Sequence, residues 1–100
     1  MTYQESLVAL SDDTRRQIYE RIIRAPAPVG IIAQGFPVSR PAISQHLKVL
    51  SDAGLVVVQQ KGNRRIYSAD PQGLVALRQY LDGLWGDVLT AFSDSFKEDI

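Results

Sequence analysis

The residues SRPAISQHLKVLSDAGL, from Ser39 to Leu55, carry the features of a single helix with a cap at each end. The hydroxyl of Ser39 can accept a hydrogen bond from an unpaired amide of the first turn, and Pro41 is tolerated close to that start. Gly54 stands where a residue in the left-handed conformation commonly ends a helix. The segment therefore predicts a helix over about residues 39–53.

The two faces of this predicted helix differ in chemistry. Ile43, Leu47 and Leu50 recur at spacings of four and three residues, which places them on one stripe that faces a core. The opposite face has no acid before Asp52, whereas a solvated helix usually mixes Glu and Lys at i,i+4. Its donors suit phosphates and base edges, although a merely solvated face is the alternative. These outward residues are Arg40, Ser44, Gln45, Lys48 and Ser51.

Two short segments rich in β-forming residues follow directly, LVVVQQ (55–60) and RRIYSA (64–69). The connection Lys61-Gly62-Asn63 between them contains Gly and has a length typical of a hairpin. Lys61, Arg64 and Arg65 make this hairpin basic. A capped helix with a polar face, followed at once by a basic hairpin, is the order of a winged helix-turn-helix. There the helix enters the major groove and the hairpin lies along the DNA backbone.

Three motifs in this order resemble the ArsR/SmtB family of small bacterial transcription repressors: LSDDTRRQIYERI (10–22), SRPAISQHLKVLSDAGLV (39–56) and GNRRIYSAD (62–70). The resemblance runs from about Leu7 to the C-terminal helix. It implies one winged helix-turn-helix domain over residues 1–100, mainly α with a small β-hairpin, in the order α-α-α-α-β-β-α. In that fold residues 39–53 form the recognition helix and residues 55–69 form the wing.

Further helices are predicted before the recognition helix. Residues 2–10 suit a short helix, and Ser11-Asp12-Asp13 supplies an N-cap and favourable negative charge for a second helix that reaches about Arg24. A short third helix is expected over residues 29–34. On the second helix the side chains expected to face the core are Ile18, Ile22 and Ile23. Its arginines, expected to be solvated or paired with neighbouring acids, are Arg15, Arg16, Arg21 and Arg24.

A long amphipathic helix is predicted at the C-terminal end. Apolar residues keep a helical period from Leu74 to Phe96, although we expect fraying after about Ser93. A continuous apolar stripe of this kind marks a subunit interface, with an intramolecular core helix as the alternative. The family resemblance implies that helices over about 2–10 and 72–93 form a two-fold homodimer. The predicted interface residues are Leu7, Leu77, Leu81, Leu84, Trp85, Val88 and Phe92.

Length and composition limit the class of protein. One hundred residues, 45% of them hydrophobic, suffice for one modest core, which in small domains a partner subunit often completes. There is no Cys, which excludes disulfides and thiolate metal sites. The N-terminus has no basic leader, and no apolar run is long enough to span a membrane. A cytoplasmic protein with no membrane partner is expected.

The formal net charge of zero is distributed unevenly along the chain. Residues 39–67 hold five basic side chains against Asp52, a net charge of +4, whereas residues 68–100 have a net charge of −4. Positive charge is therefore concentrated on the predicted helix and hairpin. The acidic C-terminal segment is expected to lie away from DNA.

Double-stranded DNA is the expected partner of the basic elements. Two recognition helices of a symmetric dimer would enter successive major grooves about 34 Å apart and read an inverted repeat. We expect Ser44 and Gln45 to contact base edges, and Arg40 to bind either a guanine or a phosphate. His46 and Lys48 are assigned to the DNA backbone, with a hydrogen-bonded boundary position as the alternative for His46. The wing contacts are assigned to Lys61, Asn63, Arg64 and Arg65.

The residues that metal-sensing members of the family use do not occur at the matching positions. Residues 28–30 are Pro, Val and Gly where one sensor site has cysteines, and the last helix has Asp82 and Asp87 but no His. We therefore expect neither a metal site nor a cofactor. No nucleophile–base pair or phosphate loop indicates an enzyme. The main alternative is a winged-helix module for protein–protein assembly, and the effector, a small molecule or a protein, is left open.

Overall fold

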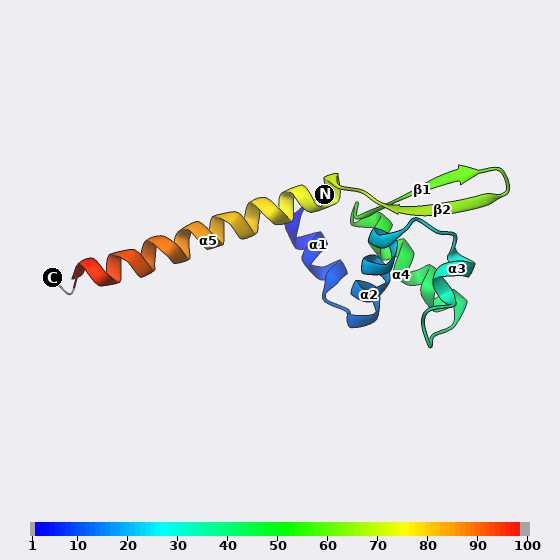
Figure 1. Ribbon diagram of the computed structural model, residues 1–100, viewed down its shortest axis with the longest axis horizontal. Coiled ribbons are helices and arrows are strands. Elements are labelled where there is room, and N and C mark those ends of the chain that lie inside the picture. Colours follow the sequence, from blue (N-terminus) through cyan, green and yellow to red (C-terminus); the bar gives the residue numbers. More distant parts are fainter. Residues whose placement is uncertain (1, 99–100) are drawn as a thin grey trace.

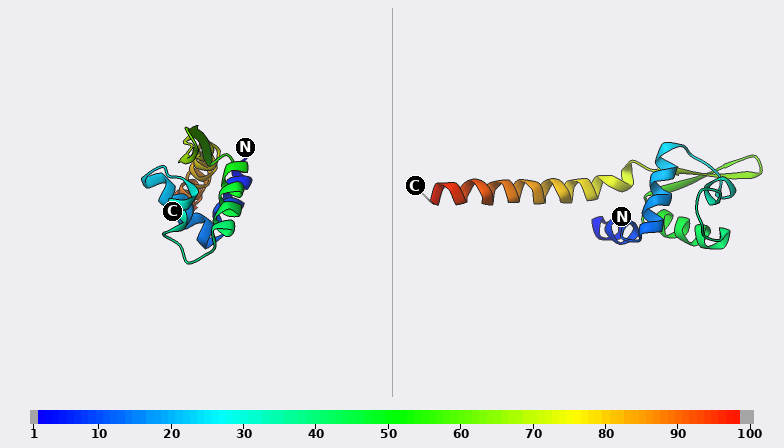
Figure 2. Two further views of the ribbon diagram at one scale, coloured as in Figure 1. Left: turned by 90° about the vertical axis from the view of Figure 1, so that its right-hand side faces the viewer. Right: turned by 60° about the horizontal axis from the view of Figure 1, so that its bottom comes forward.

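The computed structural model describes residues 2–98, which contain five helices and one two-stranded antiparallel sheet (Figure 1). In chain order the elements are α1 (Tyr3–Leu10), α2 (Asp13–Arg24), α3 (Val29–Ala33), α4 (Arg40–Asp52), β1 (Val56–Lys61), β2 (Arg64–Ala69) and α5 (Gln72–Glu98). The predicted order and the mainly helical class with one hairpin are confirmed. The first four helices form the body, from which the hairpin and α5 extend in opposite directions (Figures 1 and 2).

Local sequence signals begin and end the helices where they were expected. The Ser39 hydroxyl accepts from the Ala42 amide at 3.3 Å at the start of α4. The Asp12 carboxylate likewise accepts from the Arg15 amide at 2.9 Å at the start of α2. Beyond the end of α4, Gly54 has a φ of 76°, a left-handed conformation that glycine adopts without steric cost.

Branched apolar side chains of α2 and α4 form the centre of the core. Ile43, Leu47 and Leu50 of α4 are fully buried, as their spacing predicted, and Ile22 of α2 is buried with them. The expectation that Ile23 also faces inward is wrong, because this side chain is 53% exposed. The buried stripe of α2 runs through Ile18, Tyr19 and Ile22, and Ile23 lies just outside its edge.

The hairpin is tighter than the sequence suggested. The strands pair from Val56 with Ala69 to Lys61 with Arg64, which leaves a turn of two residues, Gly62 and Asn63. Gly62 has a φ of 63°, as the first residue of a type II′ turn requires. Lys61, predicted within the connection, is instead the last residue of β1, because the two-residue turn allows it to pair with Arg64.

A backbone bridge attaches the hairpin to the helical body. The Ala27 amide donates to the Tyr67 carbonyl at 3.2 Å, and the Tyr67 amide donates to the Ala27 carbonyl at 2.9 Å. The Tyr67 ring is half-buried and packs against the core. The segment between α2 and α3 therefore holds the base of the hairpin, while its tip extends away from the body (Figure 1).

The first turn of α5 lies directly on the backbone that follows α4. A Cβ atom added to Gly73 would overlap the Gly54 carbonyl group, whose carbon would be only 2.8 Å away. On the other side, the buried Ser6 hydroxyl of α1 donates to the Gly73 carbonyl at 3.2 Å. Further along α5, the rings of Tyr3 and Tyr80 stack with their centroids 4.0 Å apart. These contacts fix the direction in which α5 leaves the body.

Most of α5 projects away from the rest of the chain. The molecule measures 67 × 26 × 20 Å, and the long axis is largely that of α5 (Figures 1 and 2). The helix continues to Glu98, so the expected fraying after Ser93 is not seen. Leu77, predicted in the dimer interface, is only 9% exposed because this end of α5 packs on α1.

None of the helices within residues 2–98 has the length and apolar character of a membrane-spanning segment.

We predict that Gly73→Ala lowers the free energy of unfolding by about 2 kcal/mol, because the new methyl group overlaps the Gly54 carbonyl and forces the backbones apart. Gly83→Ala is the matched control, since nothing lies within 4 Å of a Cβ at this helical glycine. It should raise the stability by about 0.5–1 kcal/mol. Chemical denaturation at one fixed protein concentration measures both, and equal effects of the two changes would contradict the packing argument.

Candidate nucleic-acid interface

The exposed face of α4 carries polar side chains along its first turns. Arg40, Ser44 and Gln45 are directed away from the core, while Ile43 between them is completely buried. The helix is thus anchored from behind and presents its donors outward. This placement agrees with the predicted division of α4 into a core face and a polar face.

Lys48, further along the same face, already has a partner. Its ammonium group lies 2.8 Å from the Asp52 carboxylate, and the two side chains are 69% and 67% exposed. The hydrogen bond to this carboxylate and its negative charge raise the pKa of Lys48 above its ordinary value. An exposed pair of this kind contributes little stability, so Lys48 can exchange Asp52 for another anion at small cost.

His46 lies at the edge of the core and turns toward α2. It is half-buried, and its Nδ1 atom is 3.5 Å from the Arg15 guanidinium. Arg15 itself donates to the carbonyls of Ala9 and Val8 at 2.5 and 3.2 Å, so it joins the end of α1 to α2. These interactions favour the boundary position for His46 over the predicted contact with the DNA backbone.

Arg15 and Arg16 of α2 are held by local partners. Arg16 pairs with Asp13 at 2.8 Å, as the sequence suggested, whereas Arg15 binds backbone carbonyls rather than an acid. The Arg15 amide donates to the Asp12 carboxylate, and this hydrogen bond is the main reason why the pKa of Asp12 is lowered. The nearby charges of His46 and Arg15 act in the same direction. This cluster stabilises the body and lies apart from the wing.

The wing presents its basic residues to solvent. Lys61, Asn63, Arg64 and Arg65 are all exposed at or next to the turn. None of the ion pairs among residues 2–98 involves these side chains. Two hollows separate the hairpin from the helices. One, of about 320 Å³, lies between Ser44, Lys48 and Arg65, and the other, of about 460 Å³, is bordered by α3, α4 and the wing.

Sequence reasoning gave Gly30 no part in the site. A Cβ atom at this position of α3 would lie 3.9 Å from the Arg40 guanidinium, so the side chain of Arg40 extends back over α3. No periodicity or motif in the sequence indicates that Gly30 and Arg40 lie side by side, because they belong to two different helices on either side of the turn.

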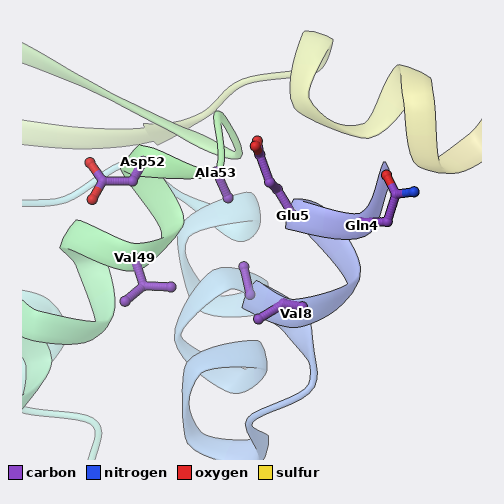
Figure 3. A pocket seen from close by; sticks show the side chains of 7 residues that line it. Gln4, Glu5, Val8, Val49, Asp52 and Ala53 are labelled. Atoms are coloured by element: carbon purple, nitrogen blue, oxygen red, sulfur yellow. The ribbon is translucent and has the colours of Figure 1, made fainter. Parts of the chain in front are cut away.

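An apolar hollow of about 470 Å³ lies on a different side of α4, against α1 (Figure 3). Val8 and Ala9 of α1 face Val49 and Ala53 across it, with Glu5 and Asp52 at its rim. It is separate from the polar face and the wing. Within residues 2–98, no group of three or more His, Cys, Asp or Glu side chains is placed to hold a metal ion.

Known proteins share this arrangement. Residues 10–59 match the model of a helix-turn-helix domain family. The chain is 53% identical over 85 residues to the HTH-type transcriptional regulator Rv2034 of Mycobacterium tuberculosis (strain ATCC 25618 / H37Rv). The aligned region covers 85% of this chain and 79% of that protein. It is 31% identical over 85 residues to the arsenical resistance operon repressor of Staphylococcus xylosus, with 82% of each chain covered. The solved structure of an ArsR-like transcriptional regulator from Rhodococcus sp. RHA1 gives a TM-score of 0.79 at 32% identity, covering 92% of this chain and 90% of that one.

The fold, the basic wing and these similarities define the class of the molecule as a winged helix-turn-helix transcriptional regulator. Within that class, the chain belongs to the ArsR family. The family resemblance of the three motifs is thereby confirmed.

The two neighbours Gln45 and His46 provide a test of which side of α4 faces DNA. We predict that His46→Ala lowers the free energy of unfolding by about 1 kcal/mol, because the variant has neither the half-buried ring nor its interaction with Arg15. DNA affinity should change less than about threefold. Gln45→Ala is the matched variant and should weaken DNA binding with little effect on stability. Denaturation curves and fluorescence anisotropy would measure both quantities, and the reverse pattern would place His46 at the DNA.

Proposed function

We propose that this protein is a transcriptional repressor that binds an inverted-repeat operator as a homodimer. The observation that carries the proposal is the combination of an acid-free outward face on the first turns of α4 with exposed wing arginines that form no ion pair within residues 2–98. Such a surface matches a groove lined by phosphates. The Staphylococcus relative is named a repressor, which supports repression rather than activation.

In this proposal α4 is the recognition helix and enters the major groove. Ser44 and Gln45 are uncharged and face outward, so they can donate to or accept from base edges without a desolvated charge. Lys48 exchanges its contact with Asp52 for a backbone phosphate. On the wing, Lys61, Asn63, Arg64 and Arg65 contact phosphates or the minor groove next to it.

The second copy in this proposal covers the projecting part of α5. Leu81, Trp85, Val88 and Phe92 are between 50% and 64% exposed and share one face of the helix. An exposed stripe of this size marks an interface, and a two-fold axis requires it to be complementary to itself. Leu84 of α5 and Leu7 of α1 are also exposed and are assigned to the same interface, while the buried Leu77 packs α5 on its own body.

An antiparallel pair of α5 helices satisfies this requirement, and the proposal places it in the following register. With the axis between Val88 and Leu89, Trp85 of one chain lies opposite Phe92 of the other, and Leu81 lies opposite Phe96. The large apolar residues of the stripe then have apolar partners. The two bodies, each with its own α4 and wing, then lie at opposite ends of the helical pair.

The wing is tested by its salt dependence. In the double variant Arg64→Ala with Arg65→Ala, affinity should fall for all DNA sequences, because binding to phosphates carries no sequence information. For each phosphate that the variant no longer neutralises, the slope of log K against log salt should fall by about 0.9. Titrations of a duplex selected from a random pool, at several salt concentrations, measure both.

Arg78→Ala is the control for this experiment, since it removes a positive charge that lies on α5 beside Asp82. Its affinity and salt slope should equal those of the unmodified protein. An unchanged slope in the wing variant would refute the wing assignment. Failure of the unmodified protein to enrich any duplex would favour a module for protein–protein assembly.

The dimer is tested by single cysteines, because the chain has none of its own. Val88→Cys places a thiol next to the proposed two-fold axis, and oxidation should link two chains rapidly. Thr90→Cys, on the opposite face of α5, should cross-link slowly or not at all. Non-reducing gels and sedimentation measure the outcome; equal cross-linking of the two variants, or a monomer at micromolar concentration, would contradict the proposed pairing.

A further inference from the structure

We infer that the hollow between α3, α4 and the wing is a seat for one phosphate group of the DNA backbone, and that Arg40 binds this phosphate rather than a guanine. The inference rests on the proposed function and specifies one contact within it. The hollow measures about 460 Å³ and brings together residues that are distant in sequence. Its lining includes Gly30, Arg40, Ser44, Asn63, Arg64 and Arg65.

The charge of this hollow is the first argument. Arg40, Arg64 and Arg65 border it, and no carboxylate of the described residues does. The ion pairs among residues 2–98 join Arg16 to Asp13, Lys48 to Asp52 and Arg78 to Asp82, so the three arginines of the hollow have no acidic partner there. Three arginines line this concave surface and give it a positive charge that attracts an anion, and a phosphate can accept hydrogen bonds from more than one guanidinium group.

The position of Arg40 is the second argument. Its guanidinium lies beside α3, where a Cβ on Gly30 would be 3.9 Å from Nη1 and 4.0 Å from Cζ. Since Arg64 and Arg65 border the same hollow, the side chain of Arg40 is directed to the space between the helices and the wing. The small Gly30 leaves room for the guanidinium to lie against α3.

The form of a DNA duplex is the third argument. Base edges form the floor of a groove, so a side chain must protrude from the protein to reach them. Phosphates form the convex ridges on either side, and a ridge can enter a concave surface. A hollow walled by α3 and the hairpin therefore fits the backbone. Ser44 lies at its border, so of the two residues assigned to base edges Gln45 is the one that lies outside the hollow and is fully available for bases.

A shared phosphate joins the recognition helix to the wing. Arg40 comes from the start of α4 and Arg64 from the start of β2, so one bound group fixes the hairpin relative to the helix. Removing either arginine weakens the contact that the other makes. We expect Arg40→Ala and Arg64→Ala each to lower affinity about tenfold, and the double variant to lose less than the product of the two.

The test uses the selected duplex with single methylphosphonates, which replace one charged phosphate by a neutral group at each position in turn. The unmodified protein should lose about tenfold in affinity at one position of each half-site. Because Arg64 still contacts this phosphate, Arg40→Ala should lose clearly less affinity at that position than the unmodified protein does, and it should select the same DNA sequence. Arg78→Ala, which removes an equal charge on α5, should keep the full pattern of the unmodified protein.

Other outcomes overturn the inference. If Arg40→Ala changes the preferred base and keeps the whole methylphosphonate pattern, Arg40 reads a guanine, and only the inference fails. If no methylphosphonate position matters to the unmodified protein, while inorganic phosphate displaces DNA more strongly than chloride at equal ionic strength and Arg40→Ala abolishes that difference, the occupant is a free phosphate rather than the backbone. If the unmodified protein binds no duplex, the proposed function fails and the inference falls with it.

Discussion

The close approach of two backbones at Gly54 and Gly73 is the constraint on which the rest of the structure depends. It lets the start of α5 lie on the chain that leaves α4, with the Gly73 carbonyl accepting from Ser6 on the other side. At the same place the Asp70 amide donates to the Leu55 carbonyl at 2.9 Å, which closes the base of the hairpin. The end of α4, the origin of the hairpin and the direction of α5 are therefore set at one junction. A side chain at Gly73 would disturb all three together.

What the sequence predicted correctly depends on neighbours within about one helical turn. The cap at Ser39, the left-handed Gly54 and the spacing of Ile43, Leu47 and Leu50 are local patterns, and each is found as expected. The errors arise where the local sequence allows more than one residue to be buried and only the three-dimensional packing determines which one is. Ile22 and Ile23 are the same residue type on adjacent positions, and only the arrangement around α2 determines which is buried. The role of Gly73 depends on a residue 19 positions earlier, a distance at which no period in the sequence operates.

In the candidate site, too, local sequence patterns were predictable and three-dimensional packing was not. Residue types and charge identified the exposed face of α4 and the basic wing, because both properties can be read from a few consecutive residues. The same residues do not determine how each side chain is oriented. His46 and Lys48 are two residues apart and were assigned to one role, yet His46 turns to Arg15, 31 residues away, while Lys48 pairs one turn along its own helix. Arg40 was left between base and phosphate, and its position beside Gly30 depends on how α3 crosses α4.

The projecting half of α5 has a consequence for how such a regulator responds to its own abundance. A lone chain exposes Trp85, Val88 and Phe92 to water, whereas in the proposed dimer these side chains are covered, so dilution favours separation into single chains. Below the dissociation constant of the pair, the concentration of the DNA-binding form rises with the square of the concentration of chains. Doubling the synthesis of such a protein would then raise operator occupancy about fourfold at low levels. A gene under its control would respond to a threshold amount of the regulator, without any ligand to set that threshold.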